Sequence, residues 1–417
     1  MALISAPASA GQWTLVRNAR QLLTLHGPSG SRRGSAMTEL NIVPKGSLLI
    51  RNGIIEDVGP ARRVENLAGA RNAREIDATG KVVMPAFVDA DVALLSPVAP
   101  SVNDPADPDR GATPVRLMSR KKVLARAAAT ATEFARYGCL SIGAHTQCAT
   151  DLQNIGKMLR VHQALQSKPM RIRSIFSPQF PNDGAKPLPQ ILEALISKWL
   201  PSVKNKKLAS VLELAVGGPE AVLDGQTLEA VAVAAAGLGY VMRFRSSLPL
   251  EPVHLQLALA AGALGIIAPL NELRTFDGPL AAVGCIRIIP ASEGFDNAGT
   301  AAANIRSAIN EGSAVALTSS YRALGNSSFN MQYLLHLAVH QLGLTMEEAI
   351  TATTWNPACS LRLSHVTASL EPGKSADLLV MDVPDYHDLP RRVGHNDVSV
   401  VMRAGHVVLR SPSLSVD

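Results

Sequence analysis

The chain has 417 residues, of which 47% are hydrophobic and 18% charged, a composition typical of a globular protein with a large core rather than of a disordered chain. It contains no run of 18 or more apolar residues, and its first ten residues carry no basic segment, so we expect no membrane span, no secretory signal and a cytoplasmic location. The net charge is +6, but the basic residues are scattered and aromatics make up only 4%, so we expect no nucleic-acid partner.

Residues 13–84 are predicted to be rich in β-structure. Short apolar runs at 13–17 and 21–25 indicate strands, and residues 27–38 are expected to form a polar loop. Residues 46–59 contain two β-branched runs around Asn52-Gly53, the dipeptide typical of a tight hairpin.

Between about residue 85 and residue 365, apolar β-runs alternate with longer alanine-rich segments, which predicts an α/β fold with a parallel (β/α)8 barrel. The active site of such a barrel lies at the carboxyl ends of the strands. We expect helices at 126–137, 191–200, 227–237, 255–263, 300–311 and 331–342, and strands at 139–143, 240–245, 265–268, 285–289 and 314–317. The tail returns to β-structure at 376–382 and 398–408, so we expect residues 1–84 and 366–417 to form a composite β-sandwich domain beside a barrel of residues 85–365.

Three motifs point to one family. Residues 80–93 read Gly-Lys-Val-Val-Met-Pro-Ala-Phe-Val-Asp-Ala-Asp-Val-Ala, residues 373–380 read Gly-Lys-Ser-Ala-Asp-Leu-Leu-Val, and residues 384–390 read Pro-Asp-Tyr-His-Asp-Leu-Pro. In these motifs the chain resembles the amidohydrolase superfamily, and within it the imidazolonepropionases, which hydrolyse a cyclic amide. The resemblance implies the barrel and the terminal β-domain, a divalent metal cofactor, and association into dimers.

The positions that would hold this metal carry other residues. By the resemblance, the first two histidine ligands fall on Asp91 and Ala93, and the final aspartate falls on Ser320. A later Asp-His pair falls on Ala268 and Pro269. Since a metal must polarise the carbonyl in the family's reaction, we expect no metal site, no bound cofactor and no catalytic residues of the family type.

Four further residues are candidates for the vestigial pocket. His145 should lie at a strand end, where we favour a hydrogen-bonded, partly buried histidine over a pocket role. Arg243, Arg245 and Arg322 should lie near the mouth of the barrel. Strand alternation sends Arg243 and Arg245 to one face, either inward, where they would replace the metal charge or hold an anion, or outward as surface charges, which we favour.

These substitutions favour a non-catalytic subunit that binds or scaffolds a partner, in a homo-oligomer or with a catalytic paralogue of the same fold. Two alternatives stay open. One is a hydrolase of a cyclic amide or other C–N bond with an altered site, and the other is a small-molecule or anion binder that uses the vestigial pocket.

Overall fold

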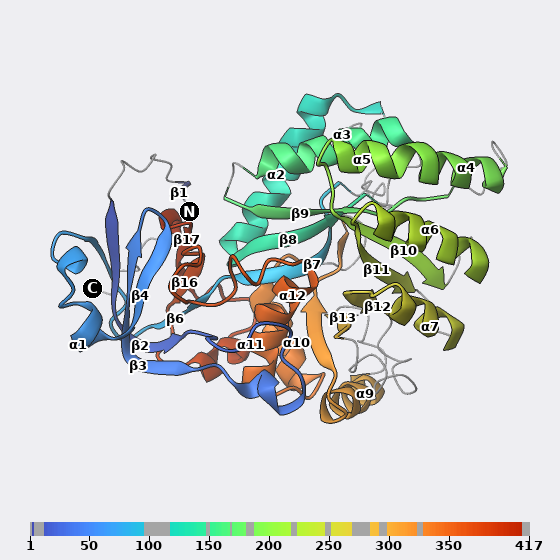
Figure 1. Ribbon diagram of the computed structural model, residues 1–417. Helices are drawn as coiled ribbons and strands as arrows, with labels where there is room; N and C mark the ends of the chain where they lie inside the picture. The colour runs from blue at the N-terminus through green and yellow to red at the C-terminus, as the bar shows by residue number, and fades with distance from the viewer. Residues whose placement is uncertain are drawn as a thin grey trace, which may run out of the picture.

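A computed structural model describes residues 2–3, 12–95, 117–146, 151–166, 169–180, 187–217, 223–246, 252–268, 284–291, 298–322 and 328–410 (Figure 1). The described residues form two sheets, one built from the middle of the chain and the other from its two ends. No helix among them is long and apolar enough to cross a membrane.

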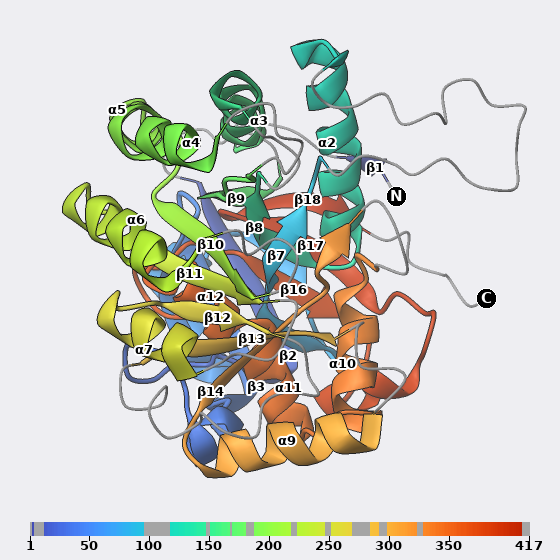
Figure 2. The same ribbon diagram turned by 90° about the vertical axis from the view of Figure 1, so that its right-hand side faces the viewer.

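The middle of the chain forms a nearly closed barrel of parallel strands, which confirms the predicted α/β class (Figure 2). Its strands run in the order of the sequence: β7 (Phe87–Ala93), β8 (Cys139–His145), β9 (Arg171–Phe176), β10 (Val211–Gly217), β11 (Val241–Ser246), β12 (Gly265–Ile267), β13 (Ile286–Pro290) and β14 (Ala314–Thr318). The short strand β15 (Tyr321–Arg322) follows β14 directly and pairs with β7, with Tyr321 opposite Val92. The last barrel strand is thereby brought beside the first.

Helices cover the outside of the barrel (Figure 2). They are α2 (Arg120–Arg136), α3 (Leu152–Leu165), α4 (Leu188–Ala194), α5 (Leu200–Asn205), α6 (Gly225–Gly237), α7 (Pro252–Ala260), α9 (Ala298–Asn310), α10 (Met331–His340), α11 (Met346–Thr353) and α12 (Trp355–Ser360). Helix α2 buries Val123, Ala127 and Ala131, whose spacing of four places them on one face. It begins six residues before the predicted start, because Ser119 caps a charged first turn that has no apolar periodicity.

Two other predictions need correction. The predicted helix 191–200 is part of a longer helical segment in which a π-helical turn, Leu195–Trp199, joins α4 to α5. Pro201 lies just after this turn, and a proline cannot donate the backbone hydrogen bond that a regular α-helix requires there. The strands β9 and β10 lie outside the predicted set, and β10 supplies a residue of the candidate site.

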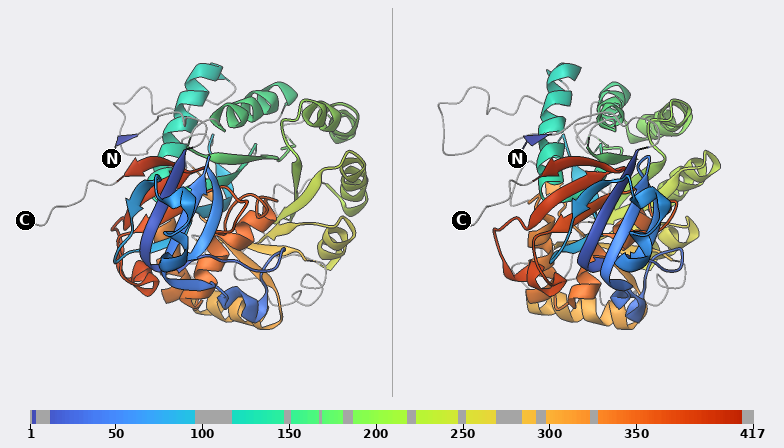
Figure 3. Two further views of the ribbon diagram at one scale, coloured as in Figure 1. Left: turned by 60° about the vertical axis from the view of Figure 1, so that its left-hand side comes forward. Right: turned by 90° about the vertical axis from the view of Figure 1, so that its left-hand side faces the viewer.

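The two ends of the chain pair in the second sheet (Figure 3). Its strands are β1 (Ala2–Leu3), β2 (Trp13–Leu23), β3 (Ile42–Arg51), β4 (Ile54–Pro60), β5 (Arg74–Asp77), β6 (Val82–Pro85), β16 (Leu378–Met381), β17 (Val398–Arg403) and β18 (His406–Arg410). Strand β6 lies between β2 and β16 and leads through Ala86 into β7. The segment 80–93 therefore passes from the terminal sheet into the barrel. The domain boundaries at residues 84 and 366 stay a prediction.

Within the terminal sheet, the two predicted runs 13–17 and 21–25 belong to one strand. Its register shifts between Val16 and Ala19, where Asn18 has a φ of +52°, so a bulge separates the two apolar runs. The expected polar loop at 27–38 contains the 3-10 turn Gly34–Thr38 and the buried Arg32. The Arg32 Nη2 donates to the carbonyl oxygens of Leu25 at 2.5 Å and His26 at 3.2 Å, so this side chain is not a solvated surface charge.

The hairpin at Asn52-Gly53 is confirmed. Asn52 and Gly53 have φ values of +50° and +83°, as a two-residue turn of this kind requires. Gly53 also touches the turn between β17 and β18, because a Cβ on Gly53 would overlap the carbonyl oxygen of Ala404.

We predict that Gly53→Ala lowers the free energy of unfolding by more than about 2 kcal/mol, since it combines the positive φ with a backbone clash. Gly80 is the matched control, because its φ is +75° and nothing lies within 4 Å of a Cβ placed there. Gly80→Ala should cost only about 1 kcal/mol. Urea unfolding of both variants measures the difference, and equal losses would contradict the packing of the two turns.

Candidate functional site

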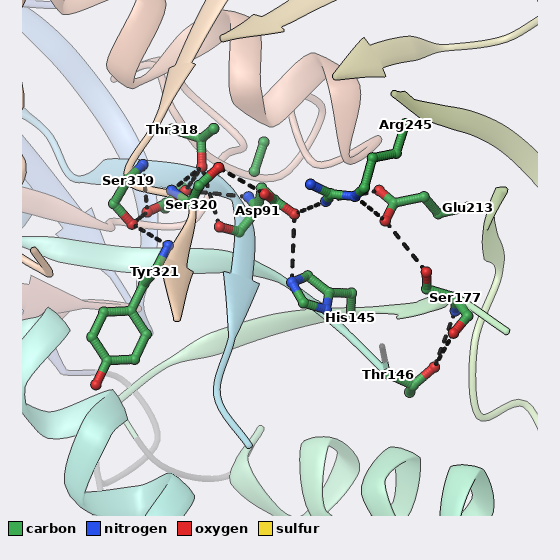
Figure 4. A network of polar contacts seen from close by, with 12 residues as sticks. Asp91, His145, Thr146, Ser177, Glu213, Arg245, Thr318, Ser319, Ser320 and Tyr321 are labelled. Carbon is green, nitrogen blue, oxygen red and sulfur yellow. Dashed lines mark hydrogen bonds and ion pairs between the residues drawn. The ribbon is translucent and has the colours of Figure 1, made fainter. Parts of the chain in front are cut away.

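Charged and polar side chains converge inside the barrel, between the middle of its strands and their carboxyl ends (Figure 4). Asp91 comes from β7, Glu213 from β10, and Arg243 and Arg245 from β11, while His145 is the last residue of β8. All five are buried, and the Arg245 side chain, at 10% exposure, is the most accessible of them. These residues define what we call the Asp91 cluster.

Two carboxylates and two guanidinium groups pair with one another in this cluster. The Arg243 Nε donates to Glu213 Oε2 at 2.7 Å, and its Nη2 donates to Asp91 Oδ1 at 3.2 Å. The Arg245 Nε donates to Glu213 Oε1 at 2.9 Å, and its Nη2 bonds Asp91 Oδ1. Each carboxylate is thus shared by both arginines, so the buried charges cancel within the cluster. His145 Nε2 lies 3.6 Å from Asp91 Oδ1.

The two arginines are held differently. Arg243 is fully buried, and all three of its nitrogens are bonded, because Nη1 donates to the carbonyl oxygen of Ala90 at 2.6 Å. Arg245 uses Nε and Nη2, and within the described residues its Nη1 has no hydrogen-bond acceptor. Arg243 therefore serves the packing of the barrel, whereas Arg245 keeps a donor in reserve.

The pKa values follow from burial opposed by pairing. Burial alone would raise the pKa of Glu213, but the nearby charges of Arg245 and Arg243 outweigh it and bring the pKa to about 2. Burial alone would lower the pKa of Arg245, but Asp91 and Glu213 raise it above its usual value. Both residues of this pair are therefore charged throughout the physiological range.

A third buried carboxylate, Asp89, joins the first and last strands of the barrel. Its oxygens accept hydrogen bonds from the hydroxyl groups of Thr318 and Ser319, and from the Ser319 backbone N–H at 3.2 Å. Burial raises the pKa of Asp89 to about 6, although these hydrogen bonds oppose the shift. Asp89 sits where the barrel closes, so it has a structural role.

Ser320 lies beside Asp91, at the place where the first and last strands of the barrel meet. Its hydroxyl donates to Asp91 Oδ2 at 2.8 Å, and its φ is +46°, a conformation that costs free energy for any residue with a Cβ. This backbone conformation turns the chain after β14, so that the next residue, Tyr321, can pair with β7.

The structure gathers most of the candidate residues in one place and corrects two expectations. Arg243 and Arg245 point inward, so the favoured outward arrangement is wrong. His145 was expected to be partly buried, but its side chain is almost fully buried, at 1% exposure, with Nε2 3.6 Å from Asp91 Oδ1. Ala93 is buried at the end of β7 and Ala268 follows β12. Pro269 lies outside the described residues, and of Arg322 only the backbone, in β15, is described.

Sequence reasoning missed Glu213, the second anion of the cluster. The signal was present in the sequence Val211-Leu212-Glu213-Leu214, where a lone acidic residue interrupts an apolar run. A charge in the middle of a buried strand must be paired, and the two arginines one strand away are its partners.

The donor atoms at these positions do not fit a divalent cation. Asp91 Oδ1 already receives two guanidinium groups, its Oδ2 receives the Ser320 hydroxyl, and the Ala93 side chain is a methyl group. Within the described ranges, no group of three or more His, Cys, Asp or Glu side chains is placed to hold a metal ion. A zinc or similar centre needs three or four such ligands.

Comparison with known proteins gives matches over nearly the whole chain. The profile of the Amidohydrolase family matches residues 261–408. An imidazolonepropionase of Solibacter usitatus is 31% identical over 94% of this chain and 98% of its own length. One from Brevibacillus brevis is 27% identical over 96% of this chain and 99% of its own. The crystal structure of A. niger ochratoxinase is 16% identical and superposes with a TM-score of 0.68 over 97% of each chain, which supports the fold alone.

The comparisons overturn the favoured expectation of a non-catalytic subunit. Relatives that match nearly end to end carry the name of an enzyme, and this favours the alternative of a hydrolase with an altered site.

We predict that Glu213→Gln lowers the free energy of unfolding by about 3–5 kcal/mol, since it leaves two buried guanidinium groups with one carboxylate. The control is Asp388→Asn, which removes a partly exposed carboxylate 3.0 Å from the exposed Arg391 and should cost less than about 1 kcal/mol. Thermal or urea unfolding measures both losses. A small loss for Glu213→Gln would show that the cluster does not hold the barrel together.

The same variant has a defined pH dependence. Because the pKa of Glu213 falls from 4.5 to about 2 on folding, its carboxylate stabilises the fold above pH 4.5, and this contribution disappears as the pH falls toward 2. The difference in the free energy of unfolding between the wild type and Glu213→Gln should therefore be largest above pH 5 and shrink by about 3 kcal/mol on acidification. Asp89 titrates in both proteins, so its contribution cancels from this difference. A gap that does not change between pH 7 and 3 would contradict the assigned pKa.

Proposed function

The chain belongs to the amidohydrolase superfamily, beside the imidazolonepropionases, and on this basis we propose that it is a hydrolase that opens a cyclic amide by cleaving a C–N bond. The observation that carries the proposal is the 31% identity to an imidazolonepropionase across 94% of this chain. The proposed substrate is a five-membered cyclic amide such as imidazolone propionate.

The position of the Asp91 cluster supports the proposal. Three of its residues, Asp91, His145 and Arg245, lie toward the carboxyl ends of their strands, where barrel enzymes carry their active sites. It combines positive donors with a histidine beside a carboxylate, and amide hydrolysis uses both kinds of group, one to stabilise negative charge on oxygen and one to move a proton.

In the proposed reaction, water attacks the carbonyl carbon of the ring, and the C–N bond then breaks. His145 takes a proton from the attacking water and returns one to the leaving ring nitrogen, so it ends the cycle as it began. Asp91, with its Oδ1 3.6 Å from His145 Nε2, orients the ring and stabilises the cation that forms. No oxidant or other co-reactant is required.

The test is a ring-opening assay with imidazolone propionate, in which the loss of the ring's ultraviolet absorbance is measured over time. We expect turnover by the wild type and a fall in kcat of about 10²–10⁴ for His145→Gln. His387→Gln is the matched control, because His387 also contacts carboxylates, those of Asp385 at 2.7 Å and Glu347 at 3.2 Å. It is half exposed and lies in the 3-10 helix Tyr386–Arg391, which is not part of the Asp91 cluster. Failure of the wild type to open imidazolone propionate or related cyclic amides would refute the proposal.

Association with a second copy, or with a paralogue of the same fold, stays a prediction. The native mass of protein purified from its own source tests it.

A further inference from the structure

The guanidinium group of Arg245 occupies the centre of the Asp91 cluster (Figure 4). Its Nη2 bonds Asp91 Oδ1 and lies 3.4 Å from Glu213 Oε2, and His145 Nε2 is 3.6 Å from the same Asp91 oxygen. A positive charge is thus held between two carboxylates and next to an imidazole. These side-chain types commonly surround a divalent cation in proteins.

One donor of this cation remains for a ligand. Arg245 spends Nε and Nη2 on the carboxylates, and within the described part of the chain its Nη1 makes no hydrogen bond. Arg243 keeps no such donor, because its three nitrogens are bonded to Glu213, Asp91 and the Ala90 carbonyl. Arg245 is also the more accessible side chain, at 10% against 0%.

We propose that Arg245 takes the place of a catalytic metal ion, binding and polarising the carbonyl oxygen of the cyclic amide through Nη1, in a centre that works without a divalent cation. The proposal rests on the proposed hydrolase function. Arg243 acts only as a positioning residue, which holds Glu213 and Asp91 so that they can clamp Arg245.

The chemistry requires no proton from arginine. When the water oxygen bonds to the carbonyl carbon, the electron pair of the C=O bond moves to the carbonyl oxygen, and Arg245 stabilises that negative charge by hydrogen bonding. The pair returns as the C–N bond breaks, and the ring nitrogen receives its proton from His145. Arginine suits this role because its guanidinium stays charged and presents several donors in one plane.

The first test measures metal directly. Purified wild-type protein should contain well under one equivalent of zinc, iron or manganese, and treatment with EDTA followed by gel filtration should change neither its melting temperature nor its turnover. Stoichiometric metal, or a loss on chelation that added metal reverses, would overturn the proposal. Metal content and melting temperature are informative even if no substrate is turned over.

The second test replaces the guanidinium. Arg245→Lys keeps the positive charge between Asp91 and Glu213 but has a single nitrogen and none at the position of Nη1, and its kcat should fall by about 10²–10³ with KM changed less. Arg245→Ala should lose at least as much and should regain part of its activity when guanidinium ion is added at concentrations that do not unfold the protein. Arg171→Lys is the matched control, because Arg171 pairs with the buried Asp377 at 2.9 Å outside the cluster, and its turnover should be unchanged.

The outcomes separate the two proposals. If the wild type turns over substrate and the kcat of Arg245→Lys is within a factor of three of the wild-type value, the role of Arg245 is refuted. The hydrolase function is then unaffected. If Arg245→Ala does not fold, Arg245→Lys and the metal analysis decide. Absence of turnover in a metal-free wild type would refute the hydrolase function, while the guanidinium group would still explain why no metal binds.

Discussion

Mutual neutralisation of four charges at the mouth of the barrel is the constraint on which the rest of the site depends. Removing an ion from water costs several kcal/mol, so Asp91 and Glu213 can be buried only because Arg243 and Arg245 are buried with them. The four side chains come from β7 and from the neighbouring strands β10 and β11, which follow much later in the sequence. Their pairing therefore fixes how β7 faces β10 and β11 across the barrel.

Both signs of charge at the centre of the Asp91 cluster come from side chains. A divalent ion requires that several anionic or neutral ligands point at one spot. In this chain the carboxylates still point inward, but guanidinium groups supply the positive charge. The N–H groups of a guanidinium point in fixed directions, whereas a metal ion attracts ligands from all sides. The donor that remains at Nη1 of Arg245 therefore has a defined direction.

Closure of the barrel uses a different carboxylate. Asp89 receives hydrogen bonds from Thr318 and Ser319 and so ties β7 to the end of β14. Ser320 then adopts a left-handed conformation, and β15 returns to pair with β7. Ser320 lies where the first and last strands of the barrel meet, and its hydroxyl donates a hydrogen bond to Asp91. This residue, with its left-handed backbone, therefore connects the closure of the barrel to the Asp91 cluster.

Much of the fold could be predicted from the sequence. The alternation of apolar runs and alanine-rich segments indicated the parallel barrel, and Asn52-Gly53 indicated the hairpin. The motif at 80–93 marked the chain's entry into the barrel and showed that Ala93 offers no ligand. Strand alternation placed Arg243 and Arg245 on the same face.

What the sequence by itself determined is thus mostly local: the type of most elements and the residues at the ends of the strands that it located. Only the tertiary structure decided that the arginines face inward, that Glu213 is their partner, and that His145 lies against Asp91. The physical reason is that a period of two assigns side chains to two faces but does not say which face is buried. That choice depends on whether compensating charges on other strands are present, and those strands meet only when the barrel closes.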